Sequence, residues 1–186
     1  MKIRNLLIAS ILFAILIGAL FFILVNEETY EYYNEEIGFK MTIPKSWEKS
    51  ETWPTSFGGG FGGGVFLRCP VNNENYSLFI VVQLQNEDSG KNLSDIVNET
   101  IELFLNSSDS NVTIVSSNSI TINGVEAYEF NIEGKYENSE YATKGKLIHI
   151  TNNEKYFDIV VECTPSSLYE EHESEINQII NSFEIT

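Results

Sequence analysis

Basic side chains are scarce in this sequence. Its 186 residues include 11 Lys and Arg against 27 Asp and Glu, which gives a formal net charge of −16. A surface of this sign repels the phosphate backbone of nucleic acids, so we expect no nucleic-acid partner. The acidic excess favours solubility, and attraction of a basic partner is the alternative interpretation.

Histidines and familiar enzyme motifs are equally rare. The sequence has no G-x-S-x-G, P-loop or H-E-x-x-H pattern. Residues 58–63 match the dinucleotide-binding pattern G-x-G-x-x-G, but that motif opens a helix, whereas a strand is expected after these residues. Of the two histidines, His149 is expected to be a packed strand residue. His172 and Glu175 offer two metal ligands on one face of an expected helix, but no second stretch of the sequence offers the remaining ligands. We therefore predict that this helix face is exposed to solvent. We therefore expect no catalytic residue, no metal and no cofactor.

One uncharged hydrophobic run, Asn5–Val25, is long enough to span a bilayer as a helix of roughly 30 Å. Lys2 and Arg4 precede it and glutamates follow it, which predicts a cytoplasmic N-terminus and an outward-facing domain at the cell membrane. A cleaved signal peptide is the alternative, although no small-x-small cleavage site closes the run. The expected organisation is a cytoplasmic tip (1–4), a single-pass anchor (5–25), a linker (26–29) and an extracytoplasmic domain (30–186).

The only two cysteines, Cys69 and Cys163, each end an expected strand directly before a turn signal. An oxidising compartment would allow them to form a disulfide, closing a loop of about 95 residues worth up to ~4.7 kcal/mol. The alternative is that both are small, buried apolar residues. We predict the disulfide.

Hydrophobic periodicity predicts an α+β domain with a predominantly antiparallel sheet. The central strand is expected at 76–85, and Asn123-Gly124 is the strongest hairpin signal. The other expected strands are 30–33, 37–43, 65–68, 112–122, 125–136, 141–151 and 155–163. Helices are expected from Leu93 to about 106 and after Pro165.

Two further features are candidate contact or modification sites. The stretch 57–64, FGGGFGGG, places Phe57 and Phe61 near Trp53, either as a contact loop for a ligand or partner or as a tolerated surface insertion. Several N-x-[ST] triplets could accept glycans on an outward-facing domain. The acceptors that we expect at turns or loops are Asn75, Asn106 and Asn111.

Three segments together resemble PsbP-like domains: YYNEEIGFKMTIPKSWE near the start, TINGVEAYEF in the middle, and KYFDIVVECTPSSLYEEHESEINQIINSFEI at the end. The resemblance covers 30–186 and implies a Mog/PsbP-type α/β/α sandwich around an antiparallel sheet, in a membrane-anchored prokaryotic member. It also implies binding rather than catalysis. The FGGGFGGG stretch is not part of the family pattern.

These expectations converge on a membrane-anchored, extracytoplasmic PsbP-like binding or assembly module without catalytic activity. Its expected partners are the membrane, through Asn5–Val25, and an extracytoplasmic or membrane protein. A surface domain that binds a small molecule or glycan through the Gly/Phe-rich loop is one alternative, and a carboxylate hydrolase is another. The oligomeric state is left open.

Overall fold

The computed structural model describes most of the expected outer domain, namely residues 28–51, 63–73, 75–85, 92–106, 111–137, 139–152 and 155–186. Among these residues, no helix is both long and apolar enough to cross a membrane. The predicted anchor, 5–25, and the contact-loop residues Trp53, Phe57 and Phe61 lie outside the described residues.

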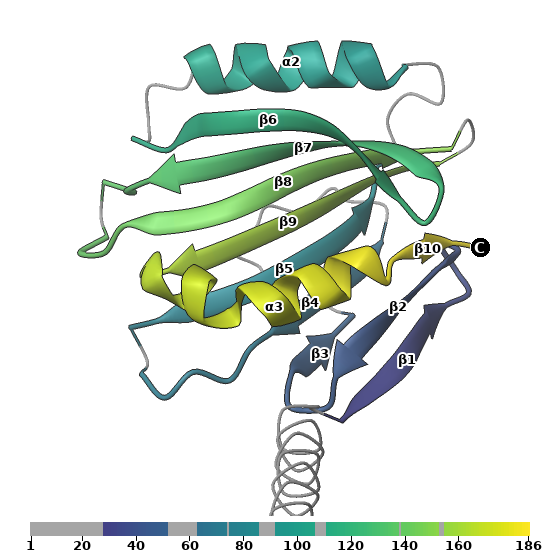
Figure 1. The fold of residues 1–186 in the computed structure, drawn as a ribbon, viewed down its shortest axis with the longest axis horizontal. Helices are drawn as coiled ribbons and strands as arrows, with labels where there is room; N and C mark the ends of the chain where they lie inside the picture. Colours follow the sequence, from purple (N-terminus) through teal and green to yellow (C-terminus); the bar gives the residue numbers. More distant parts are fainter. Residues whose placement is uncertain are drawn as a thin grey trace, which may run out of the picture.

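Seven antiparallel strands form the main sheet, in the order β3-β4-β5-β9-β8-β7-β6 (Figure 1). Their bounds are β3 Glu48–Ser50, β4 Gly64–Arg68, β5 Ser77–Leu84, β6 Thr113–Ile122, β7 Val125–Gly134, β8 Thr143–Thr151 and β9 Tyr156–Thr164. The last four strands, β6 to β9, form a meander, and β5 joins it through β9. The inner position of β5 confirms the prediction, because its side chains are buried on both faces.

Two helices cover opposite faces of this sheet. In β8, Ile148 and Ile150 belong to the core that includes α3 (Ser167–Asn181), whereas Leu147 and His149 face α2 (Leu93–Asn106). Successive strand residues point to opposite faces, so each helix covers one set. The domain is therefore α+β, mostly sheet with two helices, as the sequence predicts.

A smaller sheet of order β1-β2-β10 closes one end of the α3 core. It contains β1 (Thr29–Asn34), β2 (Phe39–Pro44) and β10 (Glu184–Ile185). The ring of Phe39 in β2 stacks on Phe183 with their centroids 5.4 Å apart, which packs the end of α3 against the hairpin. The sequence did not predict β3 or β10, because both are too short to show periodicity.

The predicted Asn123-Gly124 hairpin is confirmed, and it has a second role. Both residues have positive φ, 46° and 83°, as a two-residue type I′ turn requires. The amide of Asn123 also donates hydrogen bonds to the carbonyls of Asn181 (3.1 Å) and Phe183 (2.8 Å). The turn therefore satisfies carbonyls that the end of α3 leaves without helical partners.

The predicted disulfide is wrong: Cys69 and Cys163 are not joined. The N–H of Cys69 donates to the carbonyl of Leu78, and Leu78 is paired with Cys163 on its other side. The cysteines thus lie two strand spacings apart, on the order of 10 Å between Cα atoms, beyond the ~7 Å that a disulfide can span. Their burial, 4% and 0% exposed, agrees with the alternative of small core residues.

Candidate functional site

A cavity of about 400 Å³ opens between α2 and the strands β8 and β9. Leu103 and Phe104 of α2 line one side, and Leu147 of β8 lines the opposite side. Its floor is polar, with contributions from Thr100, His149 and Asp158. An apolar cavity with a few converging polar groups is the usual form of a binding site in proteins.

The imidazole of His149 links α2 to the sheet at the floor of this cavity, which we call the α2 groove. Its Nε2 lies 2.8 Å from Oγ1 of Thr100, and its Nδ1 lies 2.6 Å from Oδ1 of Asp158. All three residues are buried. Because a carboxylate accepts only, Nδ1–H donates to Asp158, and in the neutral ring Nε2 accepts the hydroxyl proton of Thr100.

The carboxylate of Asp158 is held by further donors. Gln85 Nε2 donates to its Oδ2 at 2.7 Å, and the hydroxyl of Tyr156 lies beside it, 2.9 Å from Nδ1 of His149. Burial, together with the nearby Asp158 charge, raises the pKa of Tyr156 far above its ordinary value, so the phenol stays a donor. No buried side-chain nitrogen or oxygen of the described residues lacks a hydrogen-bond partner.

The order Thr100–His149–Asp158 has the connectivity of a nucleophile–base–carboxylate triad. A hydrolase of this type also needs backbone N–H donors beside the nucleophile to stabilise the oxyanion. Thr100 lies inside α2, where the neighbouring N–H groups are used by the helix itself. The arrangement therefore positions α2 on the sheet.

The end of α2 carries two exposed leucines, of which Leu103 lies at the groove. Leu103 is 71% exposed and Leu105 is 79% exposed, whereas only Ile96, Val97 and Thr100 of this helix are buried. The predicted helix is confirmed in its bounds.

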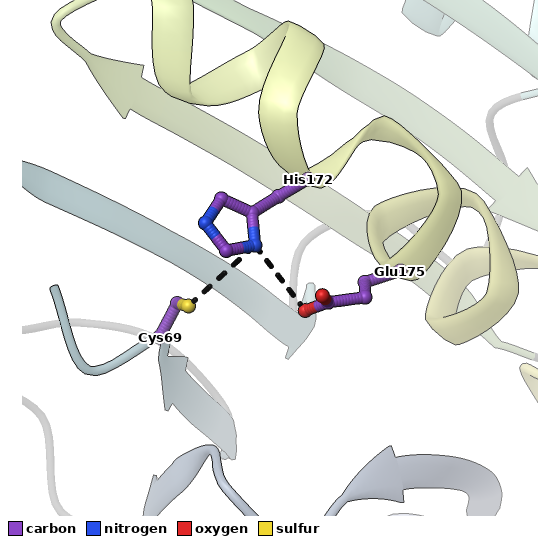
Figure 2. Close-up of side chains that lie close together, drawn as sticks. All are labelled: Cys69, His172 and Glu175. Carbon is purple, nitrogen blue, oxygen red and sulfur yellow. Dashed lines mark hydrogen bonds and ion pairs between the residues drawn. The ribbon is translucent and has the colours of Figure 1, made fainter. Parts of the chain in front are cut away.

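A second cluster lies on the other side of the sheet, where α3 passes the end of β4 (Figure 2). His172 and Glu175 extend from α3 toward Cys69. Nδ1 of His172 lies 4.0 Å from Sγ of Cys69 and 3.3 Å from Oε2 of Glu175. The indole N–H of Trp47 donates to the same Oε2 at 3.2 Å.

The sequence identified only half of this cluster. The i, i+3 spacing of His172 and Glu175 was visible, but Cys69 lies 103 residues from His172 in the chain. The predicted solvated face is wrong at these two positions, since their side chains are only 25% and 34% exposed. The turn at Cys69-Pro70 marked the end of a strand but did not indicate which helix the strand meets.

Another hollow, about 570 Å³ in volume, lies where β7, β8 and the start of α3 meet. Its lining carries two lysines, Lys135 and Lys144, and two glutamates, and Lys144 is paired with Glu170 at 2.8 Å and with Glu133 at 3.6 Å. Its charge is therefore matched within the chain, and we place the candidate site at the α2 groove instead.

The proposed glycan acceptors are all exposed, at Asn75, Asn106 and Asn111. Asn106 is the last residue of α2 rather than a loop residue. Glycosylation stays a prediction at all three positions.

Residues 27–185 match the family model described as PsbP. The chain belongs to the PsbP family. The resemblance in the sequence is thereby confirmed over residues 27–185. Among curated proteins, none matches this member of the family in sequence.

Solved structures of the same fold come from distant proteins. Cyanobacterial PsbP (CyanoP) from Synechocystis sp. PCC 6803 matches with a TM-score of 0.59 at 12% identity, over 87% of this chain and 94% of its own. LpqN, described as involved in cell envelope biogenesis of Mycobacterium tuberculosis, matches with a TM-score of 0.56 at 12% identity, over 86% and 91%. PA94 from Pseudomonas aeruginosa, a protein of unknown function, matches with a TM-score of 0.53 at 14% identity. The match covers 81% of this chain and 92% of PA94. At these identities the likeness shows the fold alone.

Proposed function

We propose that this PsbP-family chain is a membrane-anchored, extracytoplasmic binding or assembly module without catalytic activity. The observation that carries the proposal is the groove beside α2, which is lined by Leu103, Phe104 and Leu147, with Leu103 71% exposed at its mouth. Apolar side chains gathered at a concave site favour a docking function, whereas single exposed ones are ordinary.

The expected partner is a protein with an apolar ridge flanked by basic residues. The ridge would fill the groove between Leu103 and Leu147. Basic residues would complement the exposed acids Glu99 and Glu102 on α2 and the overall charge of −16. An outward-facing location is supported by the charges around Asn5–Val25 and by the described role of the structural relative LpqN in the cell envelope.

A comparison of two charge-introducing variants tests this proposal. Leu103→Asp places a carboxylate at the groove, and Ser174→Asp places one on the exposed face of α3, on the opposite side of the sheet. After crosslinking on intact cells, wild type and Ser174→Asp are expected to enrich the same membrane or envelope protein, and Leu103→Asp to lose it. Enrichment that is the same for both variants, or no specific enrichment at all, contradicts the proposal.

Protease treatment of intact cells tests the location independently. The outer domain is expected to be digested while a cytoplasmic marker protein survives. Full protection of the domain, with digestion only after lysis, would contradict the orientation.

A further inference from the structure

Three donor atoms of different chemistry converge between α3 and the end of β4. They are Sγ of Cys69, Nδ1 of His172 and Oε2 of Glu175, and all lie within 4.8 Å of one another (Figure 2). The i, i+3 spacing places two donors on one face of α3, and the N–H of Cys69 holds its backbone to Leu78 in the sheet. Rigid elements therefore supply all three donors.

Two of the three donor separations are close to those around a tetrahedral metal ion. With Zn–S, Zn–N and Zn–O bonds of about 2.3, 2.05 and 2.1 Å, tetrahedral angles place S and N about 3.6 Å apart, and N and O about 3.4 Å apart. The observed separations are 4.0 Å for Sγ–Nδ1 and 3.3 Å for Nδ1–Oε2. A shift of Sγ by a few tenths of an ångström would bring the Sγ–Nδ1 separation to the tetrahedral value. The Nδ1–Oε2 separation already lies within about 0.1 Å of it.

One ring nitrogen of His172 joins the other two donors of this arrangement. Both Cys69 Sγ and Glu175 Oε2 approach the same nitrogen of His172, and Nδ1 carries at most one proton. In the absence of an ion, the thiol of Cys69 carries a proton of its own that it can donate within the cluster. A cation among the three atoms would interact favourably with all of them.

The surroundings favour a divalent cation. The indole N–H of Trp47 already orients the Glu175 carboxylate, as groups behind metal ligands commonly do. The exposed acids Glu171 and Glu173 on α3 add negative potential nearby. Partial exposure of His172 and Glu175, 25% and 34%, leaves a path for the ion and for a water molecule.

We propose that Cys69, His172 and Glu175 form a zinc-type site with three protein ligands, and that water fills the fourth position. A thiolate, an imidazole and a carboxylate suit Zn²⁺ and related transition metals, whereas Ca²⁺ and Mg²⁺ require oxygen ligands. The ion would join the C-terminal helix to the far half of the sheet. The site is remote from the α2 groove and does not depend on the function proposed for it.

Cobalt titration of the full-length protein tests the site directly. The protein is purified in detergent without metal, with a phosphine reductant that does not compete as a thiol. One equivalent of Co²⁺ is expected to produce a thiolate-to-cobalt charge-transfer band in the near ultraviolet, and Zn²⁺ is expected to abolish it. The absence of a saturable band in the wild-type protein overturns the proposal, whatever the variants do.

Paired variants assign the ligands. Cys69→Ser is expected to lose the band and Cys163→Ala to keep it; the reverse result overturns the assignment. Glu175→Gln is expected to weaken Zn²⁺ affinity by about 100-fold or more, because loss of even an outer hydrogen-bond partner costs 10- to 100-fold. Its control, Glu171→Gln, removes the same charge from the same helix and is expected to change affinity less than about fivefold. Equal effects of these two substitutions would show non-specific attraction by acids and would refute the site.

Glu175→Gln is also suited to the test on structural grounds. Its amide oxygen can still accept the hydrogen bond from Trp47, so the metal-free protein is expected to keep the wild-type melting temperature. His172→Gln provides a second ligand deletion. If Zn²⁺ raises the melting temperature of the wild-type protein and of His172→Gln equally, the proposal is wrong.

Discussion

Substituting Thr100 by valine should show how strongly the buried hydrogen bonds hold α2 on the sheet. Valine has nearly the shape of threonine, so packing is retained while the 2.8 Å bond to Nε2 of His149 is lost. Thr100 is 8% exposed and His149 is 3% exposed, so water cannot readily replace the missing hydroxyl. A buried acceptor left unsatisfied costs about 1–3 kcal/mol of unfolding free energy.

That loss is a large fraction of the ~5–15 kcal/mol that stabilises an ordinary domain. Equilibrium urea unfolding of the full-length protein in detergent, followed by circular dichroism, should report it as a lower midpoint with an unchanged slope. The melting temperature should fall by roughly 2–4 °C for each kcal/mol.

Thr100→Ser is the matched control for this measurement. Serine keeps the hydroxyl and loses only a methyl group, at a cost of about 0.8 kcal/mol. Thr100→Val should therefore be the more destabilising of the two substitutions. A valine variant within 0.5 kcal/mol of wild type, or less destabilised than the serine variant, would refute the role assigned to this bond.

Three further predictions concern other parts of the fold. Asn123→Gly retains the turn but loses the two hydrogen bonds to the end of α3, which should lower the free energy of unfolding by about 1 kcal/mol. Asn123→Ala should lower it by about 1 kcal/mol more, because residue 123 has a positive φ that alanine adopts only with strain. Equal shifts in melting temperature for the two variants would contradict this. Burial raises the pKa of the Glu162 carboxyl despite a hydrogen bond from Tyr136. The folded protein therefore holds this proton more tightly than the unfolded chain, so Glu162 adds to the free energy of unfolding at low pH and this contribution is lost as pH rises. Glu162→Gln should accordingly be more stable than wild type at pH 7, with the difference closing below about pH 4; a difference that is constant with pH would contradict it. Mass spectrometry of unreduced peptides should find no link between Cys69 and Cys163, and detection of that linkage would overturn the strand register.

Local signals predicted the regular elements well. The apolar rhythm between Leu93 and Asn106 matches the observed α2, and the Asn123-Gly124 pair has the positive φ angles expected from its chemistry. In both cases the determining interactions lie within a few residues along the chain. β3 and β10 escaped prediction because their pairing to longer strands, rather than their own pattern, defines them.

The candidate sites depend on contacts between distant segments, which the sequence pattern does not encode. Thr100 and His149 looked like ordinary helix and strand residues until the sheet brought them to 2.8 Å. The disulfide prediction failed for a related reason. Two strand ends were assumed to be neighbours, but β5 lies between them, and Leu78 separates Cys69 from Cys163.

A light-activated crosslinking residue placed at Leu103 is the most direct test of the α2 groove as a docking site. The side chain is 71% exposed, so the probe can be introduced without disturbing the core. In intact cells, this probe should produce one discrete adduct with a membrane or envelope protein, while the same probe at Glu171 on α3 should not produce it. Identical adducts at both positions, or none at Leu103, would contradict the account.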